Sequence, residues 1–206
     1  VPGGIDMHAH GGGGHDFMEG TEEAFRAAVN AHLKHGTTSI YPTLSSSTVP
    51  MIETACKTCE KLMEEKDSPV LGLHIEGPYL NRKQAVAQNP KWIKAPVAAE
   101  YEPLLDNYSC IKRWDEAPEL PGSVEFVTAC RNHDVVSALS CTHATYEAVA
   151  AANKAGMSHA AHFYNGMPVV YKEREFKVPG TVESVYALKD MTVEMIDRVY
   201  VAGGIG

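Results

Sequence analysis

The sequence has 206 residues, of which 44% are hydrophobic and 21% charged, and its formal net charge is −8. This composition is typical of soluble globular proteins. A net negative charge without a Lys/Arg-dense run argues against a nucleic-acid partner, since phosphate binding needs a basic face. No apolar run approaches the roughly 20 residues needed to cross a bilayer, so we expect no membrane partner either.

The five cysteines are odd in number and fall mostly in or beside expected helices and strands. A disulfide framework would place them in loops, so we expect a reducing, cytoplasmic setting. Cys56 and Cys59 form a C-x-x-C motif in the middle of an expected helix, without a second ligand pair nearby. We therefore interpret them as buried helix positions and not as half of a zinc site.

Short β-branched or apolar runs alternate along the chain with longer segments of helical period. We expect strands at residues 4–10, 38–42, 70–76, 111–115, 135–140 and 159–162, with a seventh at 191–196. Helices are expected between them, at residues 21–35, 49–65, 98–107, 123–133, 145–155 and 181–188. The four glycines at 11–14 directly follow the first strand and are interpreted as a tight loop.

Repeated strand–helix units predict an α/β fold with a parallel sheet. A (β/α)8 barrel is one candidate, although a complete one usually takes about 250 residues, more than this chain has. A doubly wound open sheet is the other, and the number of units alone does not separate the two.

His8 and His10 are two apart on the first expected strand, so both imidazoles project from the same face. Two neutral ring nitrogens on one face can hold one metal ion. The pair alone is a weak indication, because such pairs are often merely half-buried. Its place at the end of a strand, before glycines that let the chain turn away, strengthens it.

Three further candidate ligands lie at the ends of other strands: Glu76, His143 and His162. An unpaired carboxylate at the end of an apolar strand is costly to bury, and either a metal ion or a salt bridge would offset that cost. Carboxyl ends of parallel strands are where α/β enzymes place their sites. Imidazoles with a carboxylate suit Zn²⁺ or Fe²⁺, which lower the pKa of bound water and polarise carbonyls, so hydrolysis of an amide or ester is expected.

The other histidines have simpler interpretations. His32, His35 and His133 are expected on helix surfaces or caps, and His74 and His159 as core imidazoles with satisfied hydrogen bonds. His15, after the glycine run, is left undecided between the surface and the pocket.

Four motifs closely resemble those of N-acetylglucosamine-6-phosphate deacetylases of the amidohydrolase superfamily. They are Pro-Gly-x-Ile-Asp-x-His-x-His-Gly at 2–11, His-Ile-Glu-Gly-Pro-Tyr-Leu-Asn at 74–81, Ala-Pro-Glu at 117–119 and His-Phe-Tyr-Asn-Gly-Met-Pro at 162–168. The first is shared by much of the superfamily. The second and fourth are much more specific, and the match extends to about residue 196.

The resemblance implies a deformed (β/α)8 barrel and hydrolysis of N-acetylglucosamine 6-phosphate to glucosamine 6-phosphate and acetate. It assigns Glu76, His143 and His162 to one metal site, with a second ion bridged by Glu76 and held by His8 and His10. Substrate-binding positions follow from the same match: Ala87, Asn165, Gly166 and Arg174. The arginine implies a phosphate contact, often to a neighbouring subunit, and hence a homodimer.

The sequence departs from the family at both ends. Residues 1–196 match a partial barrel without the preceding β-sandwich strands, and residues 197–206 resemble the closing strand of the C-terminal sandwich. The Asp-Gly-x-His and Thr-Asp-Ala segments expected between them, the second of which carries the general-base aspartate, are not found. Asp197 stands in the wrong context to replace it, so the catalytic residue is unassigned and activity of this chain is doubtful.

Two alternative functions remain. A dihydroorotase-like amidohydrolase would act on a cyclic amide, but that class usually bridges its metals with a carboxylated lysine where Glu76 stands here. A catalytically inactive metal- or sugar-phosphate-binding protein would keep the ligands without turnover.

Overall fold

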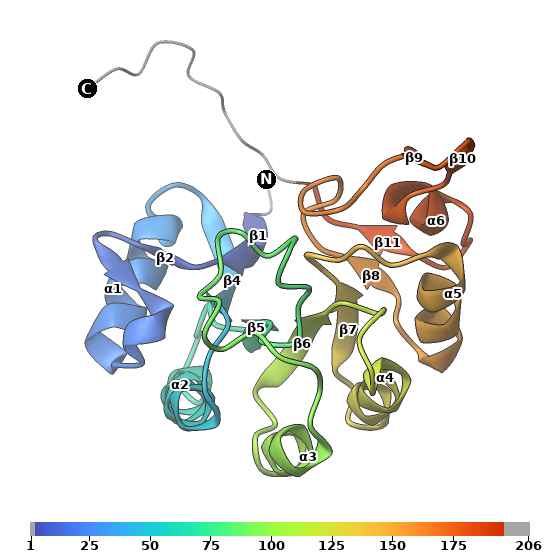
Figure 1. Cartoon of the computed structure of the whole chain (residues 1–206). Helices are drawn as coiled ribbons and strands as arrows, with labels where there is room; N and C mark the ends of the chain where they lie inside the picture. Colours follow the sequence, from blue (N-terminus) through green and yellow to red (C-terminus); the bar gives the residue numbers. More distant parts are fainter. Residues whose placement is uncertain (1–2, 196–206) are drawn as a thin grey trace.

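The computed structural model describes residues 3–195 and contains one curved sheet of seven strands (Figure 1). In spatial order the strands are β1 (Gly4–Ala9), β4 (Thr37–Leu44), β5 (Leu73–Glu76), β6 (Ile111–Glu116), β7 (Val136–Leu139), β8 (His159–Ala160) and β11 (Thr192–Val193). Every pairing between neighbours is parallel. All seven expected strands are present, several of them shorter than predicted.

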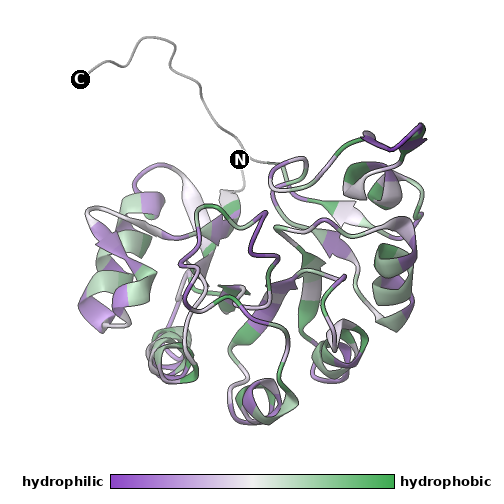
Figure 2. Ribbon diagram, in the orientation of Figure 1, coloured by the Kyte–Doolittle hydropathy of each residue, from purple (hydrophilic) through white to green (hydrophobic). Residues whose placement is uncertain are grey.

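Helices connect successive strands and lie along the outer side of the curved sheet (Figure 1). They are α1 (Glu22–Leu33), α2 (Val49–Met63), α3 (Ala98–Asn107), α4 (Ser123–Asn132), α5 (Tyr146–Ala155) and α6 (Thr181–Tyr186). Figure 2 shows both hydrophobic and hydrophilic residues on these helices, as expected where one face packs on a sheet and the other meets water. None of the helices in the described part of the chain has the length and apolarity of a membrane span.

The strand order separates the two predicted architectures. A doubly wound sheet reverses its strand order at a switch point and carries helices on both faces. Here each strand pairs with the next parallel strand along the chain, and the sheet curls in one direction. The fold is therefore an incomplete (β/α) barrel, as predicted.

Three short elements were not expected. The four-glycine run forms an antiparallel hairpin, β2 (Gly11–Gly12) with β3 (His15–Asp16), and a 3₁₀ turn, η1 (Phe17–Glu19), follows it. A second hairpin joins β9 (Tyr171–Glu173) to β10 (Phe176–Val178). The predicted domain boundary at residue 197 and the expected sandwich strand after it lie outside the described residues.

An aromatic cluster beneath β5 and β6 fixes the loop that follows Glu76. The Tyr79 and Trp114 rings stack at 5.8 Å, and Phe126 meets both edge-on at 5.1 and 5.3 Å. The indole Nε1 of Trp114 donates a hydrogen bond of 2.8 Å to the carbonyl of Gly77. Packing of this buried cluster thus holds the backbone next to the Glu76 carboxylate.

Candidate metal centre

The carboxyl ends of β1, β5 and β8 open into one cavity of about 1230 Å³. His8 and His10 come from β1 and the residue after it, Glu76 ends β5, and His162 follows β8. All four side chains line the cavity. Residues far apart in the sequence meet because the parallel strands end at one rim of the curved sheet.

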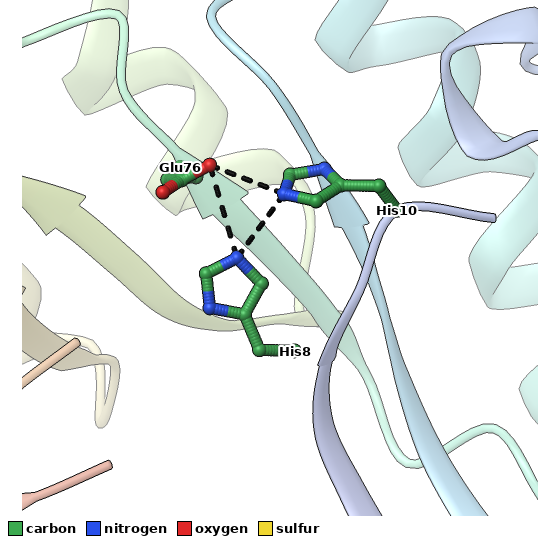
Figure 3. A group of neighbouring side chains, drawn as sticks. All are labelled: His8, His10 and Glu76. Atoms are coloured by element: carbon green, nitrogen blue, oxygen red, sulfur yellow. Dashed lines mark hydrogen bonds and ion pairs between the residues drawn. The ribbon is translucent and has the colours of Figure 1, made fainter. Parts of the chain in front are cut away.

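His8, His10 and Glu76 form the first group of potential metal ligands (Figure 3). The Nε2 atoms of His8 and His10 lie 3.2 Å apart, and Glu76 Oε2 is 3.7 Å from the first and 3.2 Å from the second. Two imidazole nitrogens and one carboxylate oxygen therefore face one another. A proton or a metal ion between these atoms would offset the repulsion between their lone pairs.

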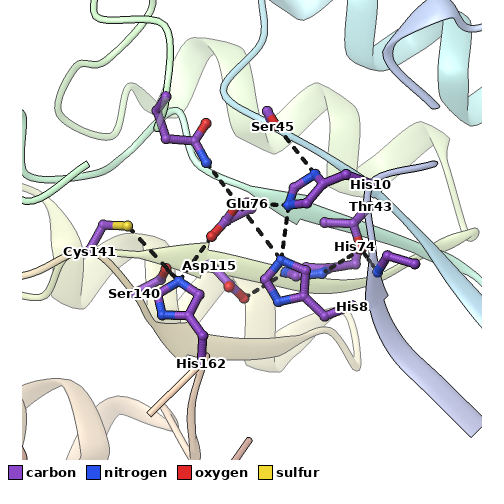
Figure 4. Close-up of polar contacts among 12 residues, drawn as sticks. His8, His10, Thr43, Ser45, His74, Glu76, Asp115, Ser140, Cys141 and His162 are labelled. Carbon is purple, nitrogen blue, oxygen red and sulfur yellow. Dashed lines mark hydrogen bonds and ion pairs between the residues drawn. The ribbon is translucent and has the colours of Figure 1, made fainter. Parts of the chain in front are cut away.

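The other carboxylate oxygen of Glu76 faces His162. His162 Nε2 lies 3.0 Å from Glu76 Oε1, while Gln88 Nε2 donates a hydrogen bond of 2.7 Å to Oε2. Ser140 Oγ lies 2.8 Å from the same imidazole nitrogen (Figure 4). Glu76 thus stands between the His8–His10 pair and His162, as the resemblance to the family implies.

His8 also contacts a buried network of charged side chains. Its ring meets the His74 ring edge-on at 4.6 Å, and His74 Nε2 lies 3.0 Å from Asp115 Oδ1. Arg113 pairs with the same Asp115 oxygen at 2.8 Å and with Glu194 Oε2 at 2.7 Å. His8, His74 and Asp115 also form a group with metal-ligand spacing, although His74 is completely buried.

The pKa shifts of Glu76 and His162 follow largely from contacts in the cavity, including their own mutual contact. Burial opposes ionisation of Glu76, yet hydrogen bonds from His10, His162 and His8 outweigh it and hold the pKa well below its usual value. Burial also disfavours the charged form of His162 and so lowers its pKa. Contacts with Cys141 and Glu76 outweigh this effect and raise the pKa to about 11. In the absence of a metal ion these contacts stabilise the protonated form of His162.

Four of the five predicted metal ligands are brought together. The fifth, His143, belongs to none of the potential metal-binding groups among residues 3–195 and does not line the cavity. Its side chain is exposed and its ring packs edge-on against Tyr171 at 5.2 Å. His74 and His159 are buried as predicted, and the Nδ1 atom of each shares a hydrogen bond with a threonine, Thr43 and Thr192 respectively. The prediction of fully satisfied rings holds only in part, because neither Nε2 atom forms a hydrogen bond with another described residue and His159 lines the cavity.

Three of the four predicted substrate positions also line the cavity: Ala87, Asn165 and Gly166. Arg174 does not. It occupies the turn between β9 and β10, with its backbone in the left-handed region (φ 53°) and its side chain exposed.

Several polar residues of the site were not singled out from the sequence. Cys141 lies beside His162, Gln88 bonds to Glu76, and Glu194 contacts His8. The available signal for Cys141 was its position one residue beyond the strand expected at 135–140. Gln88 and Glu194 carried no comparable signal, since polar residues in loops and near strand ends are common.

Comparison with known proteins is consistent with this geometry. A model of the amidohydrolase family matches residues 1–203. An N-acetylglucosamine-6-phosphate deacetylase from Lysinibacillus sphaericus is 30% identical over 202 residues, which is 95% of this chain and 50% of the relative. An N-acetylgalactosamine-6-phosphate deacetylase from Shewanella sp. (strain ANA-3) is 28% identical, with 91% of this chain and 46% of the relative covered.

The fold matches solved structures equally well. A mutant of N-acetyl-D-glucosamine-6-phosphate deacetylase from Mycobacterium smegmatis, in complex with N-acetyl-D-glucosamine-6-phosphate, superposes with a TM-score of 0.85 at 29% identity. The match covers 95% of this chain and 50% of that one. The chain thus spans about half the length of the relatives it matches.

Proposed function

Because this chain belongs to the amidohydrolase family, we propose that it takes part in the metal-dependent deacetylation of N-acetylglucosamine 6-phosphate to glucosamine 6-phosphate and acetate. The observation that carries the proposal is the convergence of His8, His10, Glu76 and His162 on one cavity. The names of the relatives supply the substrate class. A cytoplasmic location and a homodimer remain predictions.

The residues present fit a divalent cation. His8 Nδ1 lies 2.9 Å from a carboxylate oxygen of Glu194, which can only accept, so this nitrogen carries the hydrogen and Nε2 presents its lone pair to the cavity. Glu76 presents a buried carboxylate to the same space. Nitrogen and oxygen donors of this kind suit Zn²⁺, and also Fe²⁺, and Glu76 has an oxygen for each of two ions.

When bound, such an ion supplies Lewis acidity that polarises an amide carbonyl and makes water nucleophilic at neutral pH. The residues of this chain contribute binding and orientation. Gln88 fixes one oxygen of Glu76 through a hydrogen bond of 2.7 Å. The proton shuttle stays unassigned.

Substrate binding is proposed for three loop residues that line the cavity and for Arg174 on the β9–β10 turn. The Asn165 side chain and the Gly166 backbone are proposed to contact the sugar phosphate, and the backbone carbonyl of Ala87 to contact the sugar. Arg174, on its exposed hairpin, is proposed to reach a phosphate in a neighbouring subunit.

The test is acetate release from N-acetylglucosamine 6-phosphate, from its galactosamine epimer and from unphosphorylated N-acetylglucosamine, before and after removal of metal. Metal-dependent release from a phosphorylated sugar supports the proposal, and the epimer assay settles which sugar is preferred. The same assay on a version of the chain extended to the length of its relatives tests whether further residues supply the proton shuttle. Equal rates for both versions would refute that role.

Zinc titration with and without the sugar phosphate addresses the alternatives. An inactive binding protein would bind both ligands and release no acetate in either version. A cyclic-amide hydrolase would act on dihydroorotate-like substrates; against it, Glu76 occupies the position between the two ligand sets.

A further inference from the structure

A thiol lies beside Glu76 and His162 in the cavity (Figure 4). We propose that Cys141 binds a divalent metal ion as a thiolate together with Glu76 and His162, so that Glu76 joins a sulfur-containing position to the nitrogen and oxygen position of His8 and His10. The inference rests on metal binding as proposed above and replaces His143 as the ligand contributed after β7.

The distances suit one ion. His162 Nε2 lies 3.0 Å from Glu76 Oε1 and 4.0 Å from Cys141 Sγ, and all three ligand atoms lie within 4.8 Å of one another. Tetrahedral zinc, with bonds of about 2.0–2.3 Å, separates its ligand atoms by roughly 3.3–3.6 Å. His162 Nε2 therefore lies slightly closer to Glu76 Oε1, and slightly farther from Cys141 Sγ, than that geometry requires.

The hydrogen-bond pattern determines which ring nitrogen of His162 can coordinate an ion, with the Ser140 hydroxyl 2.8 Å from that nitrogen in the absence of one. Its Nδ1 lies 2.9 Å from the backbone carbonyl of Asn165, which can only accept, so Nδ1 carries the hydrogen. In the neutral ring Nε2 then presents a lone pair to the Glu76 carboxylate and the Cys141 sulfur. The same orientation of a ligand histidine by a carbonyl is common in metal sites.

The backbone around Cys141 is held in place before any ion binds. Cys141 is in the left-handed region (φ 43°), and its carbonyl accepts a hydrogen bond of 3.1 Å from the N–H of Asn81. The next N–H, of Thr142, donates to the carbonyl of Gly166 at 3.0 Å. A side chain at Gly166 would come within 3.4 Å of Cys141 Sγ, so the glycine leaves room for the sulfur.

Cys141 differs from the other cysteines in its access to the cavity. It lines the cavity and is 8% exposed, whereas the other four are completely buried and none of them lines it. A thiolate ligand favours zinc over harder cations such as magnesium or manganese. The two positions joined by Glu76 would therefore differ in their metal preference.

Cobalt(II) replacement tests the proposal directly, because a thiolate bound to cobalt gives a ligand-to-metal charge-transfer band in the near ultraviolet. We expect the band in the cobalt-loaded chain, its loss in Cys141→Ser and its persistence in Cys130→Ala, a control that removes a buried thiol on α4. Cys141→His should bind cobalt without the band. Circular dichroism confirms that each variant is folded.

Bound cobalt without the band, or a band that survives in Cys141→Ser, would overturn the thiolate ligand and leave the other ligands untouched. Failure of the unaltered chain to bind cobalt at all would instead overturn the metal site itself. Alkylation provides a readout that needs no variant. Zinc should slow the reaction of Cys141 with iodoacetamide, and an unchanged rate in a zinc-loaded chain would contradict the proposal.

Discussion

Glu194 Oε1 lies 2.9 Å from Nδ1 of His8, although the two residues are 186 positions apart in the sequence. They follow or occupy strands at opposite ends of the sheet order, β11 and β1. The contact therefore links the two edge strands of the curved sheet, and both residues line the cavity of the candidate metal centre. A carboxylate there fixes the ring orientation that points His8 Nε2 at Glu76.

Glu194→Gln should therefore weaken zinc binding by about 10- to 100-fold while the chain stays folded, because the amide is a poorer partner for the His8 N–H. Isothermal titration against zinc measures the change. Glu175→Gln, on the exposed β9–β10 turn, is the matched control and should bind as the unaltered chain does. Equal affinities for both variants would mean that Glu194 does not orient His8.

Glu76→Gln should weaken zinc binding by more than about 100-fold, the upper end of the loss expected when a residue that only orients a ligand is changed. The reason is that it removes the carboxylate shared by both ligand sets. The amide keeps the shape of the side chain but turns a donor towards the imidazoles. Glu125→Gln on the exposed face of α4 is the control. Retention of both bound ions in Glu76→Gln would contradict the bridging position.

Buried Glu116 predicts a pH dependence of stability. Burial raises its pKa to about 8, and only one of its oxygens is bonded, to the hydroxyl of Ser123 at 2.8 Å. Between pH 4.5 and about 8 the folded chain keeps this proton while the unfolded chain releases it, so the free energy of unfolding falls as the pH rises, by at most about 5 kcal/mol.

Glu116→Gln should remove that part of the pH dependence and leave the acceptor for Ser123 in place. Urea unfolding at several pH values between 5 and 8 compares the two proteins, with the zinc-free form used throughout. Parallel curves would show that Glu116 does not titrate in this window.

Much of the fold could be predicted from the sequence because the strand and helix periods are local. The alternation of apolar runs located all seven strands, but it could not distinguish a barrel from a doubly wound sheet, since strand order depends on long-range pairing. The β9–β10 hairpin was missed because residues 171–178 are mostly polar and exposed and lack a buried face that would set a period.

The candidate site was predicted in part for a related reason. His8, His10, Glu76 and His162 were found because each lies at or near the end of an expected strand, and the carboxyl ends of neighbouring parallel strands lie at the same edge of the sheet. His143 has the right residue type, yet the chain turns at Cys141 and His143 is directed towards Tyr171 instead. Residue type and distance from a strand do not determine the direction of a side chain after a left-handed turn.

That turn also yields a prediction for Gly166. Gly166→Ala would place a Cβ in the left-handed region (φ 65°), 3.3 Å from the Cα of Cys141 and 3.4 Å from its sulfur. The backbone penalty alone is about 1–2 kcal/mol. Gly14→Ala carries the same penalty at φ 86° with no atom within 4 Å, so it reports the backbone effect without the contact.

Urea unfolding should show a larger loss of stability for Gly166→Ala than for Gly14→Ala, and cobalt loading should show a weaker thiolate band for Gly166→Ala alone. Equal losses with unchanged bands would mean that the contact with Cys141 relaxes without cost and that Gly166 does not position the sulfur.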